Sequence, residues 1–113
     1  MPSARFEVRI AAGAERDLEG IYRRRKAQRG ADGPDGADTL LSELVEAVES
    51  LADHPAKGPV VPELAELGIA DYRQLSRAPF RIIYTLDADC VTVLIVADAR
   101  RDFQTLLAER VLG

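Results

Sequence analysis

The sequence predicts an α+β fold in a single domain over residues 1–113, with its elements in the order β-α-α-β-β-β-α. Two long segments repeat apolar residues every three to four positions, which is typical of helices with one buried side. Three short runs with apolar residues follow, two of them rich in β-branched residues and all separated by tight turns, which is typical of antiparallel strands. We therefore expect a helical hairpin packed on a small antiparallel sheet.

The chain opens with a strand and a long helix. Phe6, Val8 and Ile10 alternate with charged residues, which predicts a half-buried strand. A helix is expected over residues 12–29 because apolar residues recur there at helical spacing. The basic run RRRKAQR lies at its end, where the helix dipole is negative, and Gly30 is expected to terminate it.

A breaker segment, GADGPDGAD, separates this helix from the next one. Its glycines, proline and aspartates predict a mobile loop, and we expect Asp35 or Asp38 to cap the second helix. That helix is expected to run to about Asp53, since apolar residues recur at three and four positions without a gap. Pro55 and Gly58 follow its end.

The second half of the chain holds the predicted sheet. After an irregular segment with one helical turn at residues 63–67, strands are expected over residues 71–77, 80–86 and 91–97. The links between these strands are so short that neighbours must run antiparallel. A short helix over residues 102–112 completes the prediction.

Composition and charge argue against several classes of protein. The net charge is −4, whereas domains that mainly bind nucleic acid usually carry a basic excess. The charge is segregated, since residues 1–30 are mainly basic and residues 31–54 hold only acidic charged side chains. No apolar run approaches the ~20 residues that cross a bilayer, and the N-terminus is too charged for a signal peptide, so a cytoplasmic protein with no membrane partner is expected. The single cysteine, Cys90, fits a reducing compartment.

Five arginines lie in or directly after the predicted strands of the second half of the chain. Arg73, Arg77 and Arg81 surround one turn, and the pair Arg100 and Arg101 follows the last strand. Guanidinium groups fixed on a sheet suit the binding of phosphates or carboxylates. We expect these side chains to converge on one target-binding surface. The alternative is that they are exposed sheet residues in ordinary surface salt bridges.

Residue types that carry other chemistries are sparse. His54, the only histidine, follows the second helix and is expected to interact with the helix end, and no serine lies in a nucleophile motif. Cys90 is expected to be a small core residue. The chain has no zinc-ligand spacing and no phosphate-binding glycine motif between a strand and a helix. We therefore expect no metal, no cofactor and no small-molecule substrate.

Five segments in order resemble the RelE/ParE superfamily of type II toxin–antitoxin toxins. They are AERDLEGIYRRR, LLSELVEAVESLADHPAKG, YRQL, PFRIIYTL and VTVLIVADARRDF. The resemblance covers nearly the whole chain except the breaker segment. It implies the fold predicted above, and it implies a bacterial toxin that arrests growth, takes part in plasmid stabilisation and forms a hetero-oligomer with a cognate antitoxin.

The superfamily contains two activities on one fold. Toxins similar to RelE cleave mRNA on the ribosome with basic residues and an acid–base group, whereas toxins similar to ParE inhibit DNA gyrase. By position, Arg73, Arg81 and Arg101 match basic residues of the nuclease group. Leu75 stands where that group has a lysine, and Leu107 stands near an expected tyrosine. RNA cleavage needs proton transfer, for which arginine is a poor carrier, so these departures favour the ParE-like group.

The resemblance therefore implies a gyrase inhibitor that is not an enzyme. A ribosome-dependent mRNA endonuclease is one alternative, with Arg73, Arg81 and Arg101 stabilising charge, and a non-toxic binding module of the same fold is another. The antitoxin is expected in a groove beside the helical hairpin or along a sheet edge. The apolar residues expected to contact it are Leu18, Ile21, Tyr22, Leu75, Phe103 and Leu107.

Overall fold

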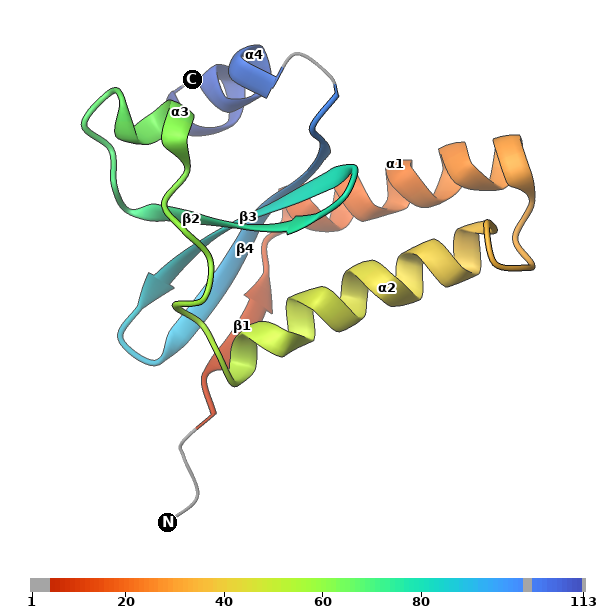
Figure 1. Ribbon diagram of the computed structural model, residues 1–113, viewed down its shortest axis with the longest axis horizontal. Coiled ribbons are helices and arrows are strands. Elements are labelled where there is room, and N and C mark those ends of the chain that lie inside the picture. The colour runs from red at the N-terminus through yellow and green to blue at the C-terminus, as the bar shows by residue number, and fades with distance from the viewer. Residues whose placement is uncertain (1–4, 101–102, 113) are drawn as a thin grey trace.

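The computed structural model describes residues 5–100 and 103–112 and has two layers of helix around one sheet (Figure 1). Its elements are β1 (Glu7–Ile10), α1 (Ala12–Arg29), α2 (Ala37–Glu49), the 3-10 helix η1 (Ser50–Ala52), α3 (Pro62–Ala65), β2 (Tyr72–Arg77), β3 (Phe80–Asp87), β4 (Cys90–Asp98), α4 (Phe103–Leu107) and the π-helix η2 (Ala108–Leu112). The α1–α2 hairpin lies on one side of the sheet, and α3 and α4 lie at the other side. The predicted α+β fold is confirmed.

The sheet has four strands in the order β1-β4-β3-β2. Strands β2, β3 and β4 are antiparallel neighbours, as the short links require. Strand β1 pairs parallel to β4, with Val8 opposite Val91, so the sheet is mixed rather than wholly antiparallel. The lengths of the links fix only consecutive strands, and the neighbour of β1 depends on where the hairpin returns the chain.

The hairpin is stabilised by apolar residues at helical spacing. Ala14, Leu18 and Ile21 of α1 are buried, and they belong to the same core as Leu40 and Leu44 of α2. Each large side chain removed from water stabilises the fold by about 1.5–3 kcal/mol. Helix α1 has the predicted bounds, and α2 with η1 covers the predicted second helix.

The breaker segment connects α1 to α2, and the aspartate cap that was expected for α2 is absent. Gly36 is the N-cap of α2 and makes no side-chain cap. Backbone carbonyls take the place of a carboxylate: Ala37 N–H donates to Gly30 O at 2.9 Å and Asp38 N–H donates to Ala31 O at 3.0 Å. The Asp38 carboxylate accepts a hydrogen bond from the Tyr22 hydroxyl instead, at 2.7 Å.

Two cores lie on opposite faces of the sheet because strand residues alternate between faces. Phe80, Ile82 and Tyr84 of β3 face the hairpin. Ile83 of β3 and Ile95 of β4 face the other way, toward the core that includes α3 and α4. The position of each side chain on β2 and β3 therefore determines which of these two faces it points to.

The irregular segment before α3 runs along the outer edge of β2. Gln74 N–H donates to Pro59 O, and Val61 N–H donates to Tyr72 O, each at 2.9 Å. Gly58 permits this close approach, since a Cβ there would lie 2.1 Å from the Gln74 carbonyl oxygen. The Gly58 N–H donates to the buried Tyr84 hydroxyl at 3.1 Å, which ties the segment to the main core.

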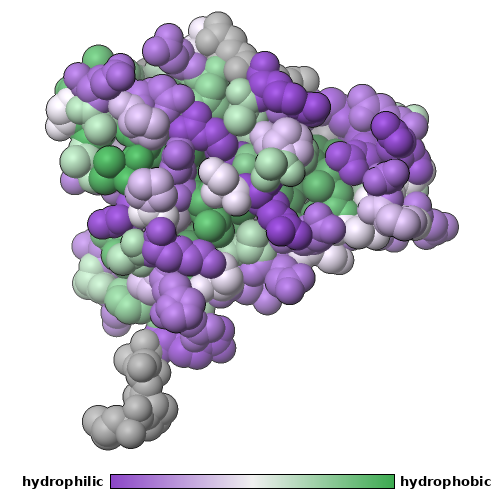
Figure 2. All heavy atoms as spheres, viewed as in Figure 1, coloured by the Kyte–Doolittle hydropathy of each residue, from purple (hydrophilic) through white to green (hydrophobic). Residues whose placement is uncertain are grey.

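Polar and apolar side chains are unevenly distributed over the surface of the molecule. In Figure 2 the tip of the hairpin is mainly polar, whereas apolar side chains gather over the sheet. Within the described ranges, no helix has the length and apolar character needed to cross a membrane.

Replacing Tyr84 with Phe is expected to lower the free energy of unfolding by about 1–2 kcal/mol, because the buried Gly58 N–H loses its acceptor. Denaturant unfolding measures this change. Tyr72→Phe is the control, since the half-buried Tyr72 hydroxyl makes no hydrogen bond with any described residue. Equal effects of the two substitutions would contradict the assigned role of the Tyr84 hydroxyl.

Candidate functional site

The strand register distributes the arginines over both faces of the sheet. Arg73 lies opposite Tyr84 and Arg77 lies opposite Phe80, so both share the hairpin side. Arg81 lies opposite Ser76 and faces the α3 and α4 side. The prediction that these guanidinium groups converge on one surface is wrong, because neighbouring positions on paired strands alternate between faces.

Arg73 and Arg77 interact with different parts of the chain. The Arg73 Nη1 donates to the Gly58 carbonyl at 2.8 Å and so supports the segment beside β2. Arg77 lies 3.5 Å from a carboxylate oxygen of Glu43 on α2, and 52% of its side chain is exposed. An exposed ion pair of this kind contributes little to stability, so Arg77 remains available to an outside anion.

Arg81 is held inside the molecule by three partners. Its Nη1 and Nη2 donate to the two Glu63 carboxylate oxygens at 2.8 and 2.9 Å, and its Nε donates to the Gln74 side-chain oxygen at 2.9 Å. The guanidinium carbon lies 3.9 Å from the centre of the Phe103 ring. Only 13% of the Arg81 side chain is exposed, against 26% for Glu63. This cluster of Arg81, Glu63, Gln74 and Phe103 joins β3 to α3, β2 and α4.

The electrostatics of the Arg81 cluster favour the ionised form of Glu63. The hydrogen bonds from Arg81 lower the pKa of Glu63, and they outweigh partial burial, which acts in the opposite direction. A two-point ion pair of this geometry is among the stronger side-chain interactions. Arg81 therefore stabilises the fold.

The remaining arginine of the predicted site that the structure describes is Arg100, just beyond β4. Its Nε and Nη2 donate to the two Asp98 carboxylate oxygens at 3.0 and 2.7 Å, and 73% of its side chain is exposed. The register brings Arg77, Phe80 and Asp98 into one row across the sheet, so Arg77 and Arg100 lie at the same end of it. Arg101 lies outside the described residues.

The predicted antitoxin contacts are divided between surface and core. Leu18 and Tyr22 line an open groove of about 400 Å³ on the outside of the hairpin, together with Leu41 of α2. Its lining is mainly apolar, and the hydrogen bond to Asp38 raises the pKa of the Tyr22 hydroxyl and fixes the ring at the groove.

The other predicted contacts lie elsewhere. Leu75 lines a second groove between α2 and β2. Ile21 packs against the sheet, and Phe103 and Leu107 are buried on the inner side of α4, at 6% and 2% exposure. Phe103 and Leu107 therefore present no surface to a partner in this structure. Their apolar character reflects the second core, which the sequence pattern alone did not separate from a contact surface.

The ion pair between Arg110 and Asp17 was not predicted. Arg110 of η2 donates to both carboxylate oxygens of Asp17 on α1, at 3.0 and 3.1 Å, and to the Leu94 carbonyl at 2.9 Å. Asp17 also accepts from the Val96 N–H at 3.0 Å. The only sequence signal was an aspartate next to the buried Leu18 on α1, which is an unusual place for a solvated charge.

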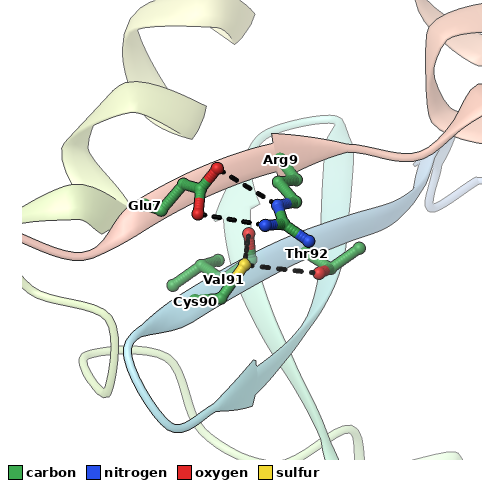
Figure 3. A network of polar contacts seen from close by, with 5 residues as sticks. All are labelled: Glu7, Arg9, Cys90, Val91 and Thr92. Atoms are coloured by element: carbon green, nitrogen blue, oxygen red, sulfur yellow. Dashed lines mark hydrogen bonds and ion pairs between the residues drawn. The ribbon is translucent and has the colours of Figure 1, made fainter.

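The face of the sheet near β1 is polar and contains the single cysteine (Figure 3). Glu7 and Arg9 on β1 form two hydrogen bonds of 3.2 Å, and Cys90 lies opposite Glu7 on β4. Cys90 is partly exposed at a sheet end rather than in the core, which differs from its expected position. Across residues 5–100 and 103–112, no group of three histidine, cysteine or acidic side chains is arranged to hold a metal ion.

Replacing Arg81 with Ala is expected to lower the free energy of unfolding by about 3 kcal/mol, because Glu63 loses its partner in a poorly solvated position. Arg77→Ala, the matched control, is expected to change it by less than about 1 kcal/mol, because its ion pair is exposed. Chemical denaturation of both variants gives the comparison. Similar small effects would mean that the Arg81 cluster does not stabilise the fold.

The stability difference between the wild type and Glu63→Gln is expected to depend on pH. The folded-state pKa of Glu63 lies below its ordinary value of 4.5, so the pair stabilises the fold fully above that value. The stabilisation is lost as the pH falls through the lowered folded-state pKa. Unfolding curves at neutral and acidic pH measure it, with Glu66→Gln, an exposed neighbour, as control. A pH-independent difference would contradict the ionised pair.

Known proteins share the family and the fold of this chain. The family model described as the ParE toxin of type II toxin–antitoxin system, parDE, matches residues 8–103. No curated protein matches the chain significantly. The chain is similar in structure to the chromosomal ParDE toxin–antitoxin system from P. aeruginosa, with 21% identity, 85% of this chain and 98% of that chain covered, and a TM-score of 0.66.

Two further solved structures share the fold. The toxin–antitoxin complex RelBE2 from Mycobacterium tuberculosis has 22% identity, covers 86% of this chain and 94% of that chain, and gives a TM-score of 0.59. A mutant of the E. coli toxin RelE in the free state has 18% identity, 96% coverage of both chains and a TM-score of 0.52. At these identities the likeness establishes the fold alone. The family match extends over most of the chain, and the chain therefore belongs to the ParE toxin family of type II toxin–antitoxin systems.

Proposed function

We propose that this toxin acts by inhibiting DNA gyrase and that a cognate antitoxin neutralises it by direct binding. The match to the ParE family over residues 8–103 is the observation that carries this proposal. Binding a large target requires exposed groups at fixed positions, and it requires no proton transfer. The arginines and grooves described above meet these requirements.

The position of Arg81 argues against the nuclease alternative. A group that stabilises charge on RNA must contact a phosphate, but Arg81 is 13% exposed and both its terminal nitrogens hold Glu63. Leu75 and Leu107 occupy positions where the resemblance led us to expect a lysine and a tyrosine, and neither side chain can transfer a proton. Binding therefore accounts better than RNA cleavage for the residues present.

Arg77 and Arg100 are the arginines best placed to contact the target. Both lie at the same end of the sheet, and both guanidinium side chains are more than half exposed, although the Asp98 partner of Arg100 is largely buried. An acidic surface on gyrase can replace Glu43 at little cost, and it can approach the exposed side of the Arg100 guanidinium while Asp98 stays bound. The predicted target-binding set also contains Arg73, Arg81 and Arg101. We propose that Arg73 and Arg81 act indirectly, because they hold the segments beside the sheet in place, and Arg101 is included by its position in the chain.

The antitoxin is proposed to lie in the groove on the outside of the hairpin. Tyr22 and Leu41 are partly exposed and line that groove beside the edge of the buried Leu18, so the free toxin leaves an apolar surface open to water there. An amphipathic helix placed against two helices buries such a surface efficiently. The antitoxin would then occupy the hairpin while the arginine end of the sheet lies beside it.

Expression without antitoxin is expected to arrest growth, induce the DNA-damage response and produce filamentous cells. Purified toxin is expected to inhibit supercoiling by gyrase, and toeprints of translated mRNA are expected to show no new cuts. Cleavage at codons in the ribosomal A site without any effect on supercoiling would establish the nuclease alternative. Growth unaffected by a folded toxin that still binds its antitoxin would establish the non-toxic alternative.

Charge-reversed variants test the proposed target surface in the same supercoiling assay. Arg77→Glu and Arg100→Glu are each expected to raise the inhibitory concentration about tenfold, which corresponds to about 1.4 kcal/mol. Arg5→Glu is the matched control, since Arg5 is also exposed and paired with a carboxylate, that of Asp53. Equal inhibition by all three variants would exclude Arg77 and Arg100 from the target surface.

A further inference from the structure

Gly20 lies in the middle of α1, a helix of 18 residues, at a position where glycine is unfavourable. A Cβ placed on Gly20 would meet no atom within 4 Å, so packing does not exclude a larger residue. Gly58, in contrast, is required by the nearby carbonyl of Gln74. Nothing within the described molecule explains a glycine at position 20, which directs attention to what approaches it from outside.

Gly20 lines an open groove of about 440 Å³ between α1, the end of β4 and the C-terminal helical segment. The floor of this groove is apolar: Leu106 on α4 is partly exposed, and Ile21, Val96 and Ala97 are buried with only their edges at the groove. It lies on the opposite side of α1 from the hairpin groove, because residues two positions apart in a helix point in nearly opposite directions. The two grooves are therefore separate surfaces.

Two arginines flank Gly20 on the same ridge of α1. Arg16 and Arg24 lie four residues before and after it, and residues at this spacing are neighbours on one helix face. Both side chains are exposed, and neither forms an ion pair or hydrogen bond with any other described residue. We call Arg16, Gly20 and Arg24 the Arg–Gly–Arg notch.

The acidic side chains that line the groove are either paired with an arginine or lie across the groove from the notch. Asp17 is engaged by Arg110, and Asp98 is engaged by Arg100. Glu109 lies on the opposite side of the groove, on η2. The rim on α1 therefore presents two positive charges that can pair with an incoming segment.

We infer that the Arg–Gly–Arg notch binds an acidic peptide segment that places an apolar side chain over Gly20. Carboxylates of that segment pair with Arg16 and Arg24, and the absent side chain of Gly20 leaves room for the segment to approach α1 closely. The occupant is an acidic stretch of the antitoxin, and in this respect the inference rests on the proposed function. A nucleic-acid backbone fits less well, because it offers no apolar group to the floor formed by Ile21, Ala97 and Leu106.

The test uses the full-length toxin and its purified cognate antitoxin, with affinity measured by calorimetry at two salt concentrations. Gly20→Gln fills the notch, and it is expected to weaken binding at least tenfold without lowering the melting temperature, because glutamine is the better helix former. Arg16→Glu and Arg24→Glu are each expected to weaken binding about tenfold and to reduce its salt dependence. Short overlapping peptides that cover the antitoxin then identify the acidic stretch.

Arg5 supplies matched controls away from α1. It is exposed, it lies before β1, and it lines neither groove on α1. Arg5→Glu makes the same charge change as Arg24→Glu, and Arg5→Gln introduces the same side chain as Gly20→Gln. Both controls are expected to bind the antitoxin with wild-type affinity.

The outcomes separate this inference from the proposed function. Wild-type affinity in the folded Gly20→Gln, Arg16→Glu and Arg24→Glu variants would overturn the inference and leave antitoxin binding intact. Failure of the wild-type toxin to bind the antitoxin at all would overturn both. Binding of the wild type to a short DNA duplex that is lost in Arg24→Glu, with no change in antitoxin affinity, would assign the notch to nucleic acid and also overturn the inference.

Discussion

The guanidinium group of Arg81 is the interaction on which the second half of the fold depends. It binds Glu63 through two hydrogen bonds, contacts Gln74 and covers the Phe103 ring, so one side chain of β3 fixes α3, β2 and α4. These elements contribute few residues each, and none of them has an extensive core of its own. A charged group with little exposure must be paired in this way, since leaving it unpaired would cost several kcal/mol. The cluster therefore joins the short elements to the sheet and removes Arg81 from the surface.

Much of the fold could be predicted from the sequence, because local patterns determine local elements. The spacing of Ala14, Leu18 and Ile21 indicated α1, and short apolar runs between tight turns placed β2, β3 and β4. The parallel pairing of β1 could not be predicted, since it depends on how the hairpin packs. The cap of α2 was also missed, because carbonyls of Gly30 and Ala31 replaced the expected aspartate.

The error in the arginine surface was avoidable. A two-residue turn at Ala78 and Pro79 pairs Arg77 with Phe80, and it therefore pairs Arg81 with Ser76 on the opposite face. The alternation of strand faces was thus available in the sequence. The partner of Arg81 was not, because Glu63 belongs to a four-residue helix 18 positions away whose orientation only the tertiary structure defines.

Helix α1 emerges as an element with two surfaces. One side forms the hairpin groove with Leu41, and the other carries two exposed arginines around a glycine, neither of them paired with another residue that the structure describes. Arg77 and Arg100 lie at one end of the sheet, and Arg100 lines a further pocket together with Arg24 of α1. The proposed target surface therefore adjoins the side of α1 that carries the notch.

The most direct measurement of the central claim is the growth arrest caused by the double variant Arg81→Met/Glu63→Leu. Replacing a poorly solvated ion pair with apolar side chains of similar size is often neutral or stabilising. If Arg81 serves the fold, the double variant folds and arrests growth as the wild type does. A folded double variant that no longer arrests growth would show that Arg81 contacts the target and would contradict the account.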